Sequence, residues 1–272
     1  MSNIKRPVAF ILVSSNHGTM IVNHNDHCTD DKGDSWGVGY QILHTGSHDH
    51  QEVDFILALL ERRRKYFGAG VVALDCGANI GVHTIEWARA MYGWGEVLAF
   101  EAQEKIFYAL AGNVVINNCF NVSARHCALG ANCTQIEIPE PDYLLPGSFG
   151  SLELKKTAGT EFIGQEIDYR KTRPVPQISI DSLRLKRLDL VKIDVEGMEE
   201  DVLKGATESI AAHSPVMMIE VVKSDKTIIE RMLSGVGYKC YPLGYMLLAV
   251  HANDPLTHNI RFENGALSLG RL

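Results

Sequence analysis

Two acidic residues, Asp75 and Glu101, each close an apolar segment, and a glycine-containing turn lies between them. The first segment, residues 71–76, is rich in β-branched residues and leads into Gly77, Gly81 and a helical pattern. A strand, a glycine turn and a helix in this order can bind a nucleotide-like ligand. An acid at the end of the next strand lies where ribose hydroxyl groups are bound. Together the two acids predict a nucleotide-like cofactor.

The glycine spacing differs from the dinucleotide fingerprint, which needs three glycines in the pattern G-x-G-x-x-G. Here Asn79 stands between Gly77 and Gly81, and Asp75 precedes the first glycine. This acid could accept hydrogen bonds from turn amides or pair with a cation. A sulfonium that carries an amino-acid group would fit. A tight strand–helix connection without a ligand is the alternative interpretation of the turn alone.

A second group of acids follows later apolar segments. Asp194 and Glu196 come directly after the apolar run 188–193, and Glu220 lies inside the apolar run 215–222. A buried carboxylate is costly unless it is paired or hydrogen-bonded. Glu220 therefore indicates a polar partner or a ligand.

The elements that position these acids alternate between strands and helices. Strands are expected at 71–76, 96–101, 121–129, 188–193 and 215–222, with an antiparallel pair at 236–241 and 246–251. Helices are expected at 52–66, 83–91 and 105–117, over Val202 to Ile210, and from a Ser224 cap to Gly235. The basic run 62–65 closes the first helix and is interpreted as structural. The third strand brings Ala128 and Leu129 to the edge of the sheet that holds Glu101, where an adenine ring could rest.

The N-terminal 50 residues are interpreted as an extension of the main domain, which spans 51–272. Residues 8–22 alternate around the turn-prone Asn16-His17-Gly18 and predict a β-hairpin. Residues 23–50 carry five histidines, but their spacing fits no compact metal motif. A solvated loop is predicted there, and no metal site is expected anywhere in the chain.

A long insertion is predicted at about 139–176, because five prolines and four glycines break any long element. Such a connection is usually a functional loop, a small hairpin or a lid. A short strand is expected at Leu152 and Leu154. The candidates for a substrate-facing segment are Ser148, Phe149 and Ser151, together with Glu220 from the later strand.

Composition limits the possible partners and location. With 272 residues, 46% of them hydrophobic, the chain can bury a full core. The balance of 26 basic and 33 acidic residues gives a net charge of -7, which argues against nucleic acid and anionic membranes as partners. No apolar run is long enough to span a bilayer, and the N-terminal run is too short for a signal peptide. Six scattered cysteines predict reduced thiols and a cytoplasmic location, and a homo-oligomer is an open alternative.

The order of elements resembles a class I S-adenosylmethionine-dependent methyltransferase and, more narrowly, the FkbM-type family. Residues 74–81 with Glu101 carry one part of the resemblance. The more distinctive part comprises residues 181–183, 191–199 and 203–206. The resemblance covers roughly residues 52–250. It implies an α/β fold of the Rossmann-like, doubly wound type, with a mostly parallel seven-stranded sheet and a reversed last strand.

The resemblance also implies S-adenosyl-L-methionine as the cofactor and assigns residues to it by position. Its methionine part would contact Asp75, Gly77, Ala78, Asn79, Gly81 and Thr84. Glu101 would bind the ribose, although Ala102 follows it where the family usually has proline. Ala128 and Leu129 would flank the adenine. Asp194 would lie beside the methionine end or the incoming nucleophile, with Glu196 facing the substrate.

The chemistry of methyl transfer is modest, because a sulfonium methyl group is already activated. The protein must align a nucleophile with the breaking bond and exclude water. If the acceptor is a hydroxyl group, a base must take its proton. The candidates are Asp194, Glu196 and His83, in that order. A solvent-facing His83 is the alternative, and Lys192 is interpreted as the ion-pair partner of a nearby acid.

The leading hypothesis is therefore O-methylation of a small molecule or glycan. An NAD-dependent oxidoreductase is a second possibility, weakened by the missing glycine and by the acid before the turn. A cofactor-binding module without catalysis is a third. A nucleic-acid methyltransferase is disfavoured, because the chain has neither a basic stripe nor an Asn/Asp-Pro-Pro-aromatic motif.

Overall fold

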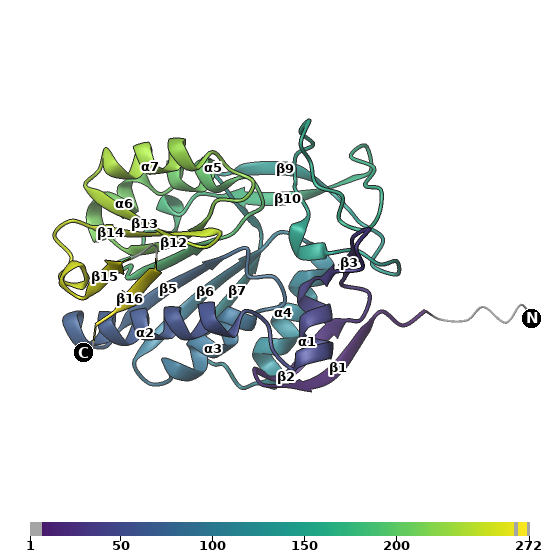
Figure 1. Cartoon of the computed structure of the whole chain (residues 1–272), viewed down its shortest axis with the longest axis horizontal. Coiled ribbons are helices and arrows are strands. Elements are labelled where there is room, and N and C mark those ends of the chain that lie inside the picture. Colours follow the sequence, from purple (N-terminus) through teal and green to yellow (C-terminus); the bar gives the residue numbers. More distant parts are fainter. Residues whose placement is uncertain (1–6, 264–265, 271–272) are drawn as a thin grey trace, which may run out of the picture.

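The computed structural model describes residues 7–263 and 266–270 and is built around a seven-stranded sheet (Figure 1). The strand order is β13-β14-β12-β11-β5-β6-β7. The strands β12, β11, β5, β6 and β7 pair in parallel, whereas β14 runs antiparallel to both of its neighbours. The predicted fold class, with a reversed last strand in this sheet, is confirmed.

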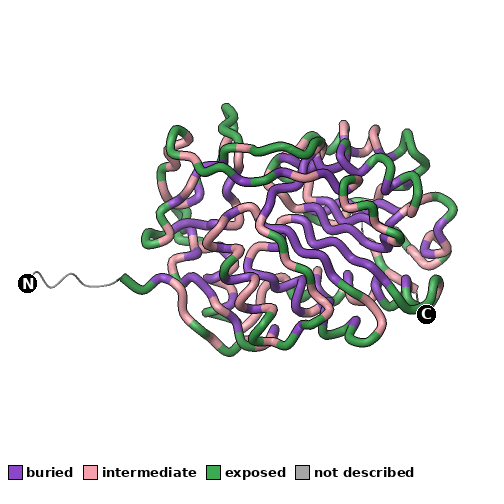
Figure 2. Tube along the Cα trace, turned by 180° about the vertical axis from the view of Figure 1, so that it is seen from behind, coloured by how far each residue is buried: buried purple, intermediate pink, exposed green. Residues whose placement is uncertain are grey.

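The strands of this sheet follow the predicted apolar segments closely. Their bounds are β5 Val71–Cys76, β6 Gly95–Glu101, β7 Val122–His126, β11 Leu190–Ile193, β12 Val216–Glu220, β13 Tyr238–Leu243 and β14 Met246–His251. Every residue of β5 and β11 is buried, as expected for central parallel strands covered on both faces. The burial map shows these strands as the continuous buried centre of the molecule (Figure 2).

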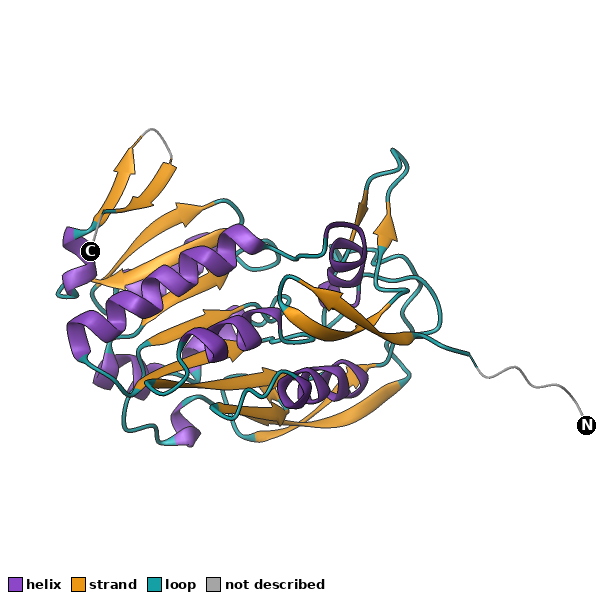
Figure 3. Cartoon of the chain, turned by 90° about the horizontal axis from the view of Figure 1, so that it is seen from below, coloured by secondary structure: helices purple, strands orange, loops and turns teal. Residues whose placement is uncertain are grey.

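Helices cover both faces of the sheet. One face carries α2 (His50–Phe67), α3 (Val82–Ala90) and α4 (Glu104–Ile116), which lie side by side in Figure 3. The other carries α5 (Glu199–Lys204), α6 (Thr207–His213) and α7 (Lys226–Ser234). The face that each helix buries follows the alternation of side chains along the strands, so Ala73 packs on the first layer and Leu74 on the second.

Two helix predictions were wrong in detail. The helix expected over Val202 to Ile210 is two short helices, because the chain breaks at Gly205 and Ala206 between α5 and α6. The cap of α7 is Asp225 and not Ser224, since the Asp225 side chain accepts the backbone N–H groups of the first turn. The basic run at the end of α2 is structural as predicted: Arg63 is buried and ion-paired with Asp254.

The segment expected to be one strand at 121–129 divides between two sheets. After β7, Ala128–Leu129 forms β8, which pairs with β10 (Thr172–Ile178), and β10 pairs with β9 (Thr134–Pro139). The long insertion is thus shorter than predicted, because β10 contains Pro174 and Pro176. Prolines are tolerated there because β8 pairs only with the last two residues of β10, Gln177 and Ile178. The rest of that edge of β10 is left open. The strand expected at Leu152 and Leu154 is absent, and a 3-10 turn (Phe149–Ser151) precedes them.

The N-terminal extension packs onto the main domain. The predicted hairpin is present as β1 (Phe10–Ser15) and β2 (Gly18–Asn23), and Asn113 of α4 accepts the backbone N–H of Ile21 at 2.5 Å. Residues 23–50 are not one solvated loop, since they form β3 (Cys28–Thr29), β4 (Ser35–Trp36) and α1 (Val38–Thr45). Met20, Val22 and Ile42 join the main core. The domain boundary at residue 50 stays a prediction.

Further elements follow the central sheet or flank it. They are the 3-10 turns Asp181–Leu183 and Pro255–His258 and the hairpin of β15 (Ile260–Glu263) and β16 (Ala266–Leu269). Within the described parts of the chain, none of the helices combines the length and apolar character that a membrane crossing requires. The six cysteines lie in those parts and are free thiols, as predicted.

Candidate functional site

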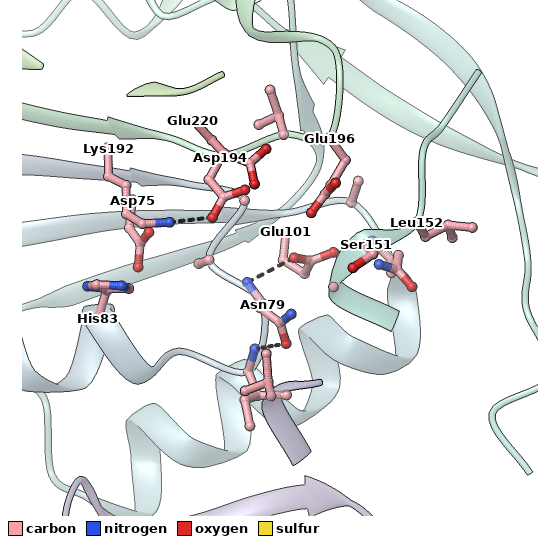
Figure 4. Close-up of a pocket in the computed structure, with 18 of the residues that line it drawn as sticks. Asp75, Asn79, His83, Glu101, Ser151, Leu152, Lys192, Asp194, Glu196 and Glu220 are labelled. Atoms are coloured by element: carbon pink, nitrogen blue, oxygen red, sulfur yellow. Dashed lines mark hydrogen bonds and ion pairs between the residues drawn. The ribbon is translucent and has the colours of Figure 1, made fainter. Parts of the chain in front are cut away.

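A cavity of about 440 Å³ opens at the carboxyl ends of β5, β6, β11 and β12 (Figure 4). In an open α/β sheet this edge is where ligands bind. The turns after β5 and β11 form its floor. Two other segments contribute to the wall: residues 36–49 of the N-terminal extension and residues 148–154 of the insertion.

Gly77 brings the turn after β5 into contact with the turn after β11. Its φ of 83° lies in the left-handed region, and a Cβ placed on it would be 1.8 Å from the backbone oxygen of Asp194. Only glycine allows this approach without displacing backbone. The close contact fixes the distance between the turn after β5 and Asp194, and both line the cavity.

Glu101 fixes the shape of the same turn from the next strand. Its two oxygens accept the backbone N–H groups of Asn79 at 3.0 Å and of Gln103 at 2.7 Å. Burial raises the pKa of Glu101 to about 7, and these hydrogen bonds oppose the rise. Figure 4 shows the carboxylate in the middle of the cavity wall, between Asn79 and Ser151.

Asp75 is a buried carboxylate with unused hydrogen-bonding capacity. One oxygen accepts the Thr84 hydroxyl at 2.5 Å, whereas Oδ1 has no partner among the described residues. Burial raises the pKa of Asp75, and the nearby Lys192 opposes that rise. Because a buried acceptor without a donor is costly, Oδ1 is suited to receive an N–H group of a ligand.

A cluster of acids lies beside this turn and is only partly neutralised. Lys192 Nζ is 2.6 Å from Asp194 Oδ2, and Lys223 Nζ is 2.6 Å from Glu196 Oε2. Glu220 Oε2 is buried with no hydrogen-bond partner in the described part of the chain. Burial and then Asp194 raise the pKa of Glu196 to about 8 and that of Glu220 to about 9. Burial therefore favours the protonated form of both side chains, whereas Lys223 opposes the rise at Glu196 and Lys192 the rise at Glu220.

Most of the predicted site residues meet at this cavity. Those that line it are Asp75, Gly77, Ala78, Asn79, His83, Glu101, Ala128, Leu129, Ser148, Ser151, Asp194, Glu196 and Glu220. Asp75, Glu101 and Asp194 open into one hollow, which the proposed cofactor site requires. The prediction that Lys192 pairs with a nearby acid is confirmed by Asp194.

Three of the predicted residues lie behind the cavity wall. Thr84 supports Asp75 through its hydroxyl. Gly81 packs against Leu110, where a Cβ would approach the Leu110 side chain to 2.6 Å. Phe149 was expected to face the substrate, but its ring is fully buried and packs on Tyr143 at a centroid distance of 4.9 Å. As an apolar side chain it stabilises the insertion from inside.

Sequence reasoning missed several residues of the wall. They are Trp36, Val38, His48, Asp49, Gln103 and Tyr245. The histidine-rich composition of 23–50 was a signal for His48, but its spacing matched no motif. Tyr245 lies in the turn between β13 and β14, and no local pattern connects it with Asp75 and Glu101, which come more than a hundred residues earlier.

The strand order and the shared hollow of three strand-end carboxylates define a domain of the class I methyltransferase type. The sequence model of the methyltransferase FkbM domain matches residues 75–240. The chain therefore belongs to the FkbM methyltransferase family, as the resemblance predicted. S-adenosylmethionine is the cofactor that this membership implies.

Two curated relatives are also methyltransferases by name. Methyltransferase 1 of Beauveria bassiana (strain ARSEF 2860) is 29% identical over 146 residues, which are 48% of this chain and 57% of that protein. Methyltransferase sdnD of Sordaria araneosa is 29% identical over 157 residues, 50% of this chain and 60% of that protein. The matched part is thus about half of this chain and less than two thirds of each relative.

A solved structure with a similar arrangement is methyltransferase FkbM from Methylobacillus flagellatus KT. It is 17% identical, with a TM-score of 0.47, over 67% of this chain and 43% of that one.

Proposed function

We propose that this protein transfers the methyl group of S-adenosylmethionine to a hydroxyl group of a small molecule or glycan. The observation that carries the proposal is the single cavity into which Asp75, Glu101 and Asp194 open. When bound, the cofactor supplies an activated methyl group on a sulfonium. Family membership and the names of the two relatives support the same reaction class.

The residues present fit this cofactor. Oδ1 of Asp75, which has no partner among the described residues, can accept an ammonium N–H, and Gly77 lets the turn after β5 lie against Asp194 at the same cavity. Glu101 can accept ribose hydroxyl groups while its hydrogen bonds to backbone hold it in place. Ala128 and Leu129 offer small apolar surfaces for adenine.

The protein's own part in the reaction is to orient the acceptor, exclude water and receive a proton. Asp194 contacts Lys192 through Oδ2, and its carboxyl oxygens can accept a hydrogen bond from the acceptor hydroxyl. Burial favours the protonated form of Glu220, which can then donate a hydrogen bond, and Lys223 contacts Glu196 at 2.6 Å. Lys223 also donates to the backbone oxygen of Ser151 at 2.7 Å and so ties the insertion to the site.

The partners and location follow from charge and cysteine content. The net charge of -7 disfavours nucleic acid and anionic membranes. Free thiols suit a reducing compartment such as the cytoplasm. We expect a small, diffusible acceptor.

Thermal unfolding with S-adenosylhomocysteine and with NAD tests the cofactor. The expected result is a rise of several degrees with the former and none with the latter, because only a bound ligand shifts the folding equilibrium. Stabilisation by NAD alone would overturn the proposal in favour of an oxidoreductase.

Methyl transfer is then measured with labelled S-adenosylmethionine and a panel of hydroxylated small molecules and glycans. The variant Asp194→Ala is expected to lose turnover with only a small change in S-adenosylhomocysteine affinity. Binding without transfer to any acceptor would favour a non-catalytic module.

A further inference from the structure

A network of five side chains lies along one wall of the cavity. Its centre is the Tyr245 hydroxyl, which lies 3.3 Å from Asp49 Oδ2 and 3.1 Å from Glu52 Oε2. Each carboxylate in turn faces an imidazole: His48 Nε2 is 3.1 Å from Asp49 Oδ2, and His83 Nε2 is 3.4 Å from Glu52 Oε1. We call these five residues the histidine network. All of them except Glu52 line the cavity.

Each of the two imidazoles has one ring nitrogen that makes no hydrogen bond to the described residues. In both His48 and His83, Nδ1 is buried and has no hydrogen-bond partner in residues 7–263 and 266–270. A carboxylate beside Nε2 favours the proton on that nitrogen, so Nδ1 carries the lone pair. His83 is 8% exposed and lines the cavity, which leaves a ligand as the natural donor to it.

The surroundings keep both rings neutral. Burial lowers the pKa of His48 and, more strongly, that of His83. The cation Lys192 on β11 and the imidazole of His17 on the hairpin lower both pKa values further, whereas Asp49 and Asp194 oppose the shift at His48. Neutral rings with free lone pairs are acceptors of hydrogen bonds from hydroxyl groups.

We propose that the histidine network binds the methyl acceptor, and that His48 Nδ1 and His83 Nδ1 accept hydrogen bonds from two of its hydroxyl groups. Two acceptor atoms on one wall call for at least two donors, which points to a polyhydroxylated molecule. Two lysines line or flank this part of the cavity, and both are ion-paired, Lys192 with Asp194 and Lys223 with Glu161 at 3.0 Å, so an anionic acceptor meets no unpaired lysine there among the described residues. The acceptor is therefore a neutral polyol of the sugar type. This assignment rests on the proposed function.

The protonation of the network is tested without any acceptor. Nitrogen-15 NMR of the full chain, loaded with S-adenosylhomocysteine at pH 7, reports which ring nitrogen holds the proton. The expected result is a neutral ring protonated at Nε2 for both His48 and His83, and a change in both spectra in Tyr245→Phe. A proton on Nδ1 of either ring would overturn the inference.

The class of acceptor is tested in the same sample with methyl β-D-glucopyranoside, a neutral sugar, and with the methyl β-glycoside of glucuronate, which differs by its carboxylate. The glucoside is expected to shift the Nδ1 signals of both rings, and glucuronate to shift neither. No shift with the glucoside, or an equal shift with glucuronate, would overturn the assignment.

Kinetics separate this inference from the proposed function. With a hydroxylated acceptor found in the panel, His48→Gln and His83→Gln should each raise the acceptor KM at least tenfold and leave S-adenosylhomocysteine affinity unchanged. His44→Gln is the matched control, because His44 is exposed on α1 and bonds its own helix at the Tyr40 oxygen. Normal methyl transfer with an unchanged acceptor KM in both variants would overturn only the acceptor-binding role of the histidine network. Failure of the native chain to bind the cofactor would overturn the proposed function.

Discussion

The buried Lys192 forms an ion pair with the half-buried Asp194 at the centre of the site, with 2.6 Å between Nζ and Oδ2. The two residues are two positions apart at the end of β11, so their side chains leave the strand on the same side. Lys192 is also the register partner of Asp75 on β5. Burial alone would lower the pKa of Lys192, but Asp194, Glu52 and Asp75 together raise it well above its usual value. The charge of Lys192 is thus stabilised by acids on α2, on β5 and directly after β11.

Replacing this cation should be severely destabilising. Lys192→Met leaves buried carboxylates without their partner, which costs about 3–5 kcal/mol. Urea unfolding of the free protein measures the loss. The matched control is Lys204→Met, whose ion pairs with Glu200 and Asp201 are at the surface and are worth less than about 1 kcal/mol. Equal losses in the free energy of unfolding for the two variants would show that the burial of Lys192 does not strengthen its interactions with the acids.

The contact between the two turns predicts a second difference in stability. Gly77→Ala places a methyl group 1.8 Å from the backbone oxygen of Asp194, whereas Gly93→Ala meets nothing within 4 Å. Both glycines have a φ near 80°, so the backbone strain is matched. Gly77→Ala should therefore cost about 1–3 kcal/mol more than Gly93→Ala and abolish S-adenosylhomocysteine binding. Calorimetry and urea unfolding check both parts, and similar losses in the two variants would contradict the close contact.

The main sheet and the cofactor half of the site were predictable because their signals are local. An apolar run of five or six residues, a glycine turn and a helical period identify each strand–helix unit. Once β5, β6 and β11 are parallel neighbours, their carboxyl ends meet at one edge. Asp75, Glu101 and Asp194 must then come together, although they are far apart in the chain.

The histidine network was not predictable, because its contacts join residues without a local pattern. Tyr245 reaches Glu52 across 193 positions, and the pairing depends on how α2 packs against the turn between β13 and β14. The helix α1 was not predicted, because a segment of eight residues is too short to show a clear helical spacing of apolar residues. Pro174 and Pro176 indicated a loop, and only the open edge of β10 explains why they lie in a strand.

Glu101→Gln should weaken binding of S-adenosylhomocysteine. The neutral amide loses charge and presents an NH₂ group to one of the two backbone N–H donors that hold the turn. We expect the affinity to fall about 10- to 100-fold by calorimetry, which is about 1.4–2.8 kcal/mol. The control Glu104→Gln, at a half-exposed position on the next helix, should leave this affinity unchanged. Unchanged affinity in Glu101→Gln would remove this residue from the ribose site.

Glu220 should make the free protein less stable as the pH rises. Its pKa is raised from 4.5 to about 9, so between these values the unfolded chain releases a proton that the folded chain keeps. The unfolded state then binds fewer protons, and the free energy of unfolding falls with increasing pH across this window. Glu220→Gln removes the effect, so its stability should decline less between pH 5 and pH 9 in urea unfolding. The control Glu230→Gln alters a half-exposed side chain on α7 and should keep the native pH dependence. An identical decline in Glu220→Gln and the native chain would show that this carboxyl group is ionised in the fold at neutral pH.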